Sequence, residues 1–161
     1  MENKPIKRSP HILVLSKDHH AGLLFCWKIK EGLKRNIDLH RIKKYVNYFW
    51  EHHLKPHFGE EETLLFNQVD DNLSQQGKNE HLMLQKHIDG LNHDEKGLKG
   101  DYLEFAELLI KHIRFEERTL FPHLEQILPL PVLKNAEEYL AQQHSAPFKD
   151  DYADEFWIDK K

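Results

Sequence analysis

Two ten-residue stretches of the chain repeat each other and decide the fold. The first reads His57-Phe-Gly-Glu-Glu-Glu-Thr-Leu-Leu-Phe66, and the second reads His112-Ile-Arg-Phe-Glu-Glu-Arg-Thr-Leu-Phe121. Aligned without a gap, they share the pattern His-x-x-x-Glu-Glu-x-x-Leu-Phe. Residues four apart on an α-helix lie one turn above each other, so the His and the first Glu of each copy point into the same space. Each copy therefore predicts a helix that presents a His/Glu clamp.

The segments around both copies carry apolar residues at spacings of three and four, which is typical of amphipathic helices. We expect four helices, at about residues 16–35, 38–66, 77–91 and 101–121, joined by polar loops at 67–76 and 92–100. These helices predict an all-α protein with an up-and-down four-helix bundle.

Capping residues and prolines suggest where these helices begin and end. Ser16 and Asp38 are good N-caps for the first two helices, and Asp101 opens the fourth with the spacing of a capping box. Pro56 is expected to kink the second helix near His57, and Pro122 is expected to end the fourth.

The C-terminal part of the sequence follows a different pattern. Residues 132–142 predict a short fifth helix, and residues 146–161 form an acidic, aromatic tail that should pack over the bundle or fray. We therefore expect the bundle within residues 1–128, with residues 129–161 packing on, or extending from, the same domain.

The inner faces of the expected helices carry histidines and glutamates. The first and third helices hold a weaker repeat, Asp18-His19 and Glu80-His81, each ahead of an apolar stripe. Because the inner faces of a four-helix bundle converge on one axis, six side chains should meet there: His19, His57, Glu61, His81, His112 and Glu116. Buried carboxylates are costly without a compensating cation, so this set predicts metal binding, and two bridging carboxylates suit a pair of ions.

The residue types narrow the choice of metal. Imidazole with carboxylate suits iron, zinc, copper or nickel, and the chain has a single cysteine, Cys26, so a thiolate site is excluded. Iron is the favoured ion and zinc the main rival. The order His-x-x-x-Glu differs from the Glu-x-x-His of ferritin-like di-iron bundles, which this sequence lacks.

Single residues permit simpler interpretations. A lone histidine on an apolar face is more often a hydrogen-bonded core residue than a ligand, so the prediction depends on the six acting together. His53 lies one turn before His57 and is either a further ligand or a hydrogen-bond donor to one. Glu62 and Glu117 lie off the inner face, where they would orient a neighbouring ligand histidine or pair with external Lys and Arg.

From Ser16 to Pro122 these residues resemble the hemerythrin-like family, also called the HHE cation-binding domain, most specifically in the repeated His-x-x-x-Glu-Glu-x-x-Leu-Phe. The resemblance implies a bundle that holds two iron ions with a bridging oxo or hydroxo group. By this resemblance His19 and His112, or their partners, would each complete one iron, and Glu61 and Glu116 would bridge the two.

Two features depart from the oxygen-carrying members of that family. The carriers place a His-x-x-x-His pair on the third helix, whereas here the corresponding pair is His53 with His57 on the second. They also use an Asp five residues after the last His, where this sequence has Glu116 four residues after His112.

The resemblance implies a non-haem di-iron protein that binds or senses dioxygen, nitric oxide or peroxide. A di-iron enzyme or repair protein, acting as a peroxidase or oxidase, in nitric oxide handling, or as an iron donor to iron–sulfur clusters, is the alternative, as is an iron-responsive regulatory module. A metal- and oxygen-binding protein is favoured over an enzyme.

Composition argues against other partners. The 23 basic and 27 acidic residues are spread along the chain, giving a net charge of −4 and no basic footprint for nucleic acid. The longest apolar stretches, at residues 12–15 and 23–27, are far shorter than the roughly 18–20 residues of a membrane span. The N-terminus lacks the apolar core of a secretory signal, so the cytoplasm is the expected location.

Overall fold

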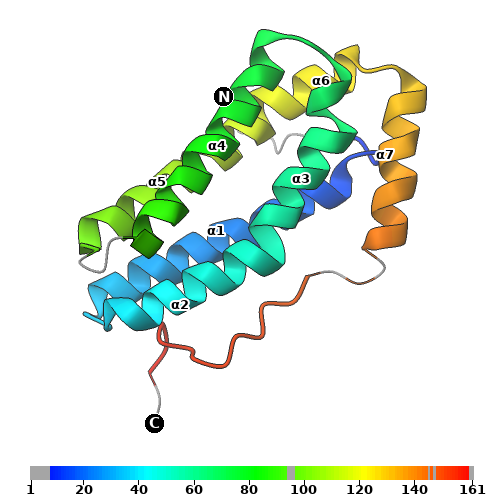
Figure 1. The fold of residues 1–161 in the computed structure, drawn as a ribbon. Helices are drawn as coiled ribbons and strands as arrows, with labels where there is room; N and C mark the ends of the chain where they lie inside the picture. The colour runs from blue at the N-terminus through cyan, green and yellow to red at the C-terminus, as the bar shows by residue number, and fades with distance from the viewer. Residues whose placement is uncertain (1–7, 94–96, 145, 147, 160–161) are drawn as a thin grey trace, which may run out of the picture.

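The computed structural model describes residues 8–93, 97–144, 146 and 148–159, and this part of the chain is helical with no strand. Four helical rods form the bundle (Figure 1). The first is α1 (Leu13–Lys34), and the second joins α2 (Leu39–Phe49), the π-helix η1 (Trp50–Leu54) and α3 (Lys55–Leu64). The third is α4 (Asn72–His93), and the fourth joins α5 (Lys99–Phe115), the π-helix η3 (Glu116–Leu120) and α6 (Phe121–Ile127).

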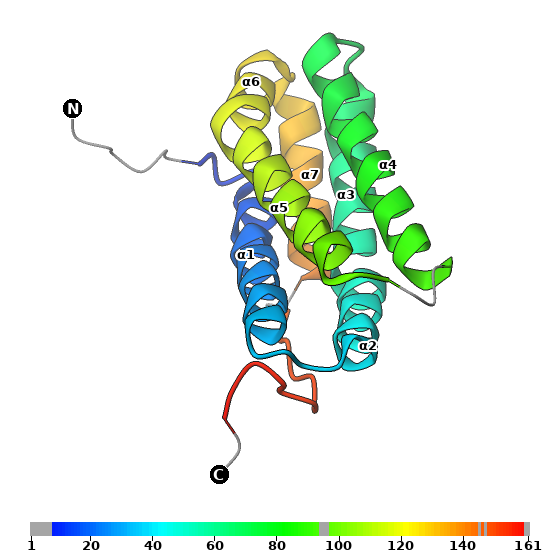
Figure 2. The same ribbon diagram turned by 90° about the vertical axis from the view of Figure 1, so that its left-hand side faces the viewer.

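Successive rods run in opposite directions, as expected for an up-and-down bundle. Figure 2 shows the turn from α1 to α2 at one end of the molecule and the turn from α3 to α4 at the other. A short 3-10 helix, η2 (Phe66–Gln68), lies in the second of these connections. The prediction of an all-α four-helix bundle is confirmed.

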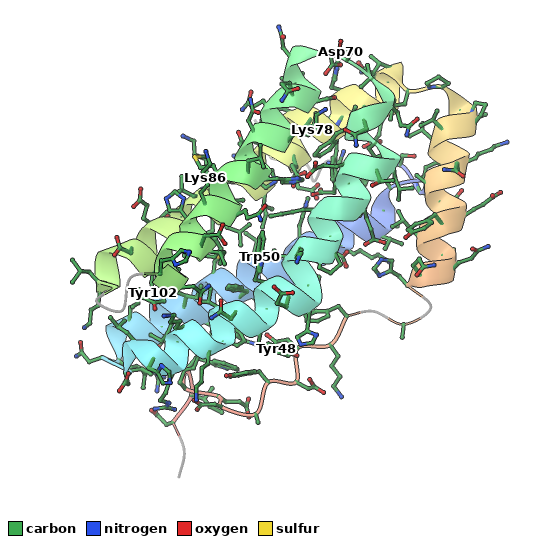
Figure 3. All side chains as sticks on the ribbon, in the orientation of Figure 1. Tyr48, Trp50, Asp70, Lys78, Lys86 and Tyr102 are labelled. Carbon is green, nitrogen blue, oxygen red and sulfur yellow. The ribbon has the colours of Figure 1, made fainter. Side chains whose placement is uncertain are left out.

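Each rod that carries a repeat copy contains a π-helix that ends two residues before a proline. The Lys55 N–H bonds the Trp50 carbonyl five residues back, and the Phe121 N–H bonds that of Glu116. Proline has no N–H to donate and its ring crowds the preceding turn, so a widened turn accommodates Pro56 and Pro122 without breaking the rod. Trp50, labelled in Figure 3, begins the first of these turns. The expectation that Pro122 ends the fourth helix is therefore wrong.

Three helix starts also differ from the expectations. Helix α1 begins at Leu13 rather than Ser16, whose hydroxyl donates to Glu117 instead (2.6 Å). The predicted loop at residues 67–76 is shorter, because the Asp71 carboxylate accepts the Ser74 N–H (2.8 Å) and supports a helix from Asn72.

Helix α5 begins at Lys99, two residues before Asp101. The Asp101 carboxylate accepts the Leu98 N–H (3.1 Å), so Asp101 is the third residue of the helix and Leu98 is the N-cap. The Asp38 cap is confirmed, since its side chain accepts the His40 N–H (2.8 Å). Residues 94–96 of the loop expected at 92–100 lie outside the described residues.

Two apolar clusters fill the bundle, one toward each end. The first is aromatic-rich and includes Phe25, Tyr45, Phe49 and Phe105. The second contains the Leu-Phe pairs of both repeat copies, Leu65-Phe66 and Leu120-Phe121, all fully buried, together with residues of α6 and α7.

Helix α4 approaches the second cluster closely. A Cβ atom at Gly77 would lie 2.8 Å from a Leu120 methyl carbon and 3.0 Å from the Phe66 ring. The missing side chain therefore lets α4 pack against the ends of both repeat copies.

The C-terminal residues pack on the bundle. Helix α7 (Leu130–Gln143) buries Leu133 and Leu140 in the second cluster and lies beside α3 (Figure 1). The tail then runs along the far end of the molecule, where Phe156 and Trp157 join the aromatic cluster. Residues 145, 147, 160 and 161 lie outside the described residues. Among the described residues, no helix combines the length and apolar character that crossing a bilayer requires.

Candidate metal centre

The six side chains predicted to meet on the bundle axis do come together. His19 comes from α1, the pair His57 and Glu61 from α3, His81 from α4, and His112 with Glu116 from the junction of α5 and η3. The four histidines are 2–5% exposed, and both glutamates are fully buried. The structure thus gathers four imidazoles and two carboxylates in the interior, although three of the four predicted helix starts were misplaced.

The six side chains form two overlapping groups suited to holding a metal ion. In the first, the Nε2 atoms of His19 and His57 lie 3.6 and 3.3 Å from Glu61 Oε2, and His19 Nε2 lies 3.2 Å from Glu116 Oε1. Each residue offers one ligand-type atom, and these atoms lie within 4.8 Å of one another.

The second group uses the same two glutamates with the other two histidines. His81 Nε2 lies 3.1 Å from Glu61 Oε1 and 3.9 Å from Glu116 Oε2, and His112 Nε2 lies 3.0 Å from Glu116 Oε1. Glu61 therefore turns one oxygen toward each histidine pair. Both carboxylates belong to both groups, which is the arrangement that bridging two ions requires.

The atoms that face this centre lack hydrogen bonds. The four Nε2 atoms and all four oxygens of Glu61 and Glu116 are buried, and none has a hydrogen-bond partner within the described residues. Buried polar atoms are otherwise almost always paired, because leaving one unpaired costs about 1–3 kcal/mol. Eight such atoms in one place fit a metal centre, where each could be a ligand.

The outward nitrogens of the histidines are all paired with carboxylates. His19 Nδ1 lies 2.7 Å from Glu117, and His81 Nδ1 lies 2.9 Å from Glu62. An Nδ1–H that donates to a carboxylate leaves the lone pair on Nε2, so it sets both the tautomer and the ring orientation for metal binding. Glu62 and Glu117 thus hold histidines, as one of the two expected roles, and Glu117 also fills the other by pairing with Arg8.

The residues before His19 and His81 do the same for the repeat histidines. Asp18 lies 3.1 Å from His57 Nδ1, and Glu80 lies 2.7 Å from His112 Nδ1. Sequence reasoning did not assign these two carboxylates a role. The signal was available, because each directly precedes an inward histidine and therefore points about 100° away from it, toward the neighbouring helix.

Phenylalanine rings of the repeat copies also contact histidines of adjacent helices. Phe66 of the first repeat copy stacks on His81 (5.5 Å between ring centroids), and Phe121 of the second stacks on His19 (5.4 Å). Phe58 also stacks on His81 at 3.9 Å. The spacing that the two copies share therefore supplies two inward ligand-type residues, together with a Glu and a Phe that hold the histidine of an adjacent helix.

The electrostatics of the metal-free protein show that this centre favours cations. Burial opposes protonation of the imidazoles, yet the adjacent carboxylates outweigh it and raise the pKa of His57 to about 9 and that of His112 to about 10. Burial likewise acts to raise the pKa of Glu61, but His57, His19 and His81 hold it well below its usual range. Positive charge, supplied by protons or by metal ions, is needed to balance the two carboxylates.

His53 lies outside both groups. Its Nε2 is 3.4 Å from the Asp18 carbonyl oxygen, and its ring packs between Phe49 and Phe148. Burial and the neighbouring His57 lower the pKa of His53 to about 4, which keeps this imidazole neutral. In this structure it is a neighbour of Asp18 rather than a member of the His/Glu set.

Comparison with known proteins agrees with these observations. A protein-family model, described as the hemerythrin HHE cation binding domain, matches residues 11–124 of the chain, and this range includes all six inward residues. No curated protein and no solved structure gives a significant match to the chain. Together with the helical bundle and its buried His/Glu groups, the match shows that the chain belongs to the hemerythrin HHE cation-binding domain family.

Proposed function

We propose that the chain holds two iron ions through His19, His57, Glu61, His81, His112 and Glu116, and that it binds or senses dioxygen, nitric oxide or peroxide there. The eight unpaired, buried ligand-type atoms of these residues support the proposal more than any other observation. A combination of imidazole and carboxylate with positions left open is typical of non-haem iron, although zinc could occupy the same ligands.

The ligand count leaves room for a small molecule. Each group offers two imidazole nitrogens and two carboxylates, one oxygen from each, so each ion would have four protein ligands. Iron with nitrogen and oxygen ligands commonly has six positions, of which a bridging oxo or hydroxo group would fill one. At least one position per ion is then open.

The surroundings favour a small, weakly polar molecule. Phe58, Phe66 and Phe121 stack on the histidines, and Leu65 and Leu120 are fully buried beside the centre. When bound, two ferrous ions would supply the two electrons that reduce dioxygen. The chain's own residues hold the imidazoles and exclude water, and the adjacent histidines keep Glu61 ionised by holding its pKa well below its usual range.

The test is an anaerobic preparation loaded with ferrous iron and then exposed to air. We expect two iron ions per chain and a new charge-transfer absorption that is absent from a zinc-loaded control, since zinc has no redox chemistry. An iron-loaded sample whose spectrum does not change in air would contradict the proposal. Sustained consumption of peroxide or nitric oxide would instead favour the enzyme alternative, in which the same centre turns over.

A further inference from the structure

A small cavity lies against the half of the metal centre that contains His57. Its volume is about 220 Å³, and its lining includes both inward and surface groups: Asp18, His52, His53, Pro56, His57, Glu60, His144, Ala146 and Phe148. His57 and its carboxylate partner Asp18 belong to this wall as well as to the buried centre. The cavity therefore reaches the residues that hold one side of the centre.

Three residues of this cavity form a ligand set of their own. Asp18, Glu60 and His144 each offer one ligand-type atom, and these atoms lie within 4.8 Å of one another. His144 Nε2 lies 2.8 and 2.9 Å from the two oxygens of Glu60. The side chains of Asp18 and Glu60 are 12% exposed and that of His144 is 25% exposed, so the set is sheltered yet open to solvent.

The charge of the cavity favours a cation. Two carboxylates line it, whereas no Lys or Arg occurs among its described lining residues. A set of two carboxylates and one imidazole suits divalent transition metals such as ferrous iron, manganese or zinc.

Among the described residues, the second half of the centre has no counterpart to this set. In the repeat, Glu60 is the third residue after His57, and the third residue after His112 is Phe115. Phe115 packs against the second apolar cluster. A carboxylate at position 60 is thus not needed for the bundle or for the buried groups, which the other half builds without one.

We propose that Asp18, Glu60 and His144 form a third, outer binding site for a divalent transition-metal ion, and that ions pass from it beside His57 into the buried centre. The outer site stands on its own residues, while the passage rests on the proposed function of the buried centre. Asp18 links the two, because it belongs to the outer set and holds the His57 ring.

A purely structural role would be to tie α7 to α3 through the His144–Glu60 pair. The chain offers a matched control for that role, since His11 Nδ1 bonds Glu137 of α7 at 3.0 Å and neither residue belongs to the outer set. Loss of the His144–Glu60 pair or of the His11–Glu137 pair removes one contact of the α7 segment. Only the loss of the His144–Glu60 pair also removes proposed metal ligands.

The experiment is a calorimetric titration of metal-free full-length protein with Zn²⁺, on the wild type, the double variant Glu60→Gln/His144→Gln and the control His11→Gln. We expect three ions per chain in the wild type and the control. The double variant should keep the two tight ions and bind the third at least about tenfold more weakly. Equal stoichiometry and equal affinities in all three proteins would overturn the outer site.

Two further measurements separate this inference from the buried centre. The variant Glu61→Gln/Glu116→Gln should still bind one ion, at the outer site. The quadruple variant that also carries Glu60→Gln/His144→Gln should bind none, and an ion still bound to it would contradict the outer site. In stopped-flow uptake, the two tight ions should enter Glu60→Gln/His144→Gln at least about tenfold more slowly than the control. If Glu60→Gln/His144→Gln lost the third ion but took up the two tight ions at an unchanged rate, the outer site would be supported and the passage of ions through it would be contradicted.

Discussion

The two halves of the centre match in what faces inward and differ in what lies behind. His57 with Glu61 and His112 with Glu116 have the same spacing, and each imidazole is held by a carboxylate from the neighbouring helix, Asp18 or Glu80. Behind His57 lies a small cavity lined by Asp18 and Glu60, whereas behind His112 the position equivalent to Glu60 is Phe115, which is partly buried and packs against the second apolar cluster.

This difference suggests that the inward residues and the residues behind them meet different requirements. On the proposed function the inward residues serve two ions at once, so a change in either shared glutamate alters the ligand set of both. The residues behind them need only hold the imidazoles and exclude water, and they can diverge. One half is then free to provide access from solvent while the other closes the interior.

The largest effect is expected from the shared carboxylates. Glu61 turns one oxygen toward each histidine pair, and Glu116 lies within 4 Å of His19, His81 and His112. Glu61→Gln and Glu116→Gln should each reduce the binding of both ions, because neither glutamate belongs to one ion alone. Metal content per chain checks this, with the exposed Glu104→Gln as control. A variant that lost one ion and kept the other at full affinity would show that the replaced glutamate does not bind both ions.

The next effect concerns the rings of the two repeat copies. Phe66 and Phe121 are fully buried and stack on His81 and His19. Replacement of either by Ala should lower the free energy of unfolding of the metal-free protein by about 3–5 kcal/mol, the usual cost of such a cavity. Denaturant unfolding measures it. A loss below about 1 kcal/mol in one copy only would show that the two halves are not packed alike.

A smaller effect is expected from the carboxylates that hold the histidines. Glu62→Gln removes the charged partner of His81 and should weaken metal binding about 10–100-fold while keeping both ions. Glu117→Gln should cost more, because Glu117 also accepts from Ser16 and pairs with Arg8 (2.8 Å). Competition with a chelator gives both affinities. Equal, negligible losses would mean that the carboxylates do not orient the imidazoles.

The smallest effect is expected at the lone thiol, which belongs to neither half. Cys26 is fully buried, and burial raises its pKa to about 12, so at neutral pH it is almost entirely protonated. A thiol reagent should therefore modify the folded protein only as slowly as the protein unfolds. Rapid modification of the native protein at pH 7 would show that this part of α1 opens locally.

The sequence placed four of the inward residues, His57 with Glu61 and His112 with Glu116, by one strict rule, the four-residue spacing that puts two side chains on one helix face. It placed His19 and His81 by a weaker repeat and by the convergence of the four inner faces. The start of α1 was hard to locate, since its N-cap Ile12 makes no side-chain hydrogen bond. The start of α4 was missed although Asp71 is a good N-cap residue, because the polar stretch 67–76 was assigned to a loop. The π-helical turns before Pro56 and Pro122 could not be read from periodicity, because a proline pattern alone does not distinguish a break from a widened turn.

The outer surroundings of the centre depended on contacts between distant segments. Glu80 and His112 are 32 residues apart in sequence, and His144 and Glu60 are 84 apart. Hydrophobic periodicity assigns a residue to a face but does not say which neighbour that face meets. The sequence could therefore suggest that Glu62 and Glu117 orient a histidine, but which carboxylate pairs with which histidine is shown only by the packed helices.

The central claim is that two ions share Glu61 and Glu116. X-ray absorption at the iron edge of the loaded wild-type protein tests it most directly. The account predicts two irons per chain, nitrogen and oxygen ligands, and an iron neighbour within about 4 Å of each iron, as in other two-metal sites. A single iron per chain, or irons with no metal neighbour at that distance, would contradict it.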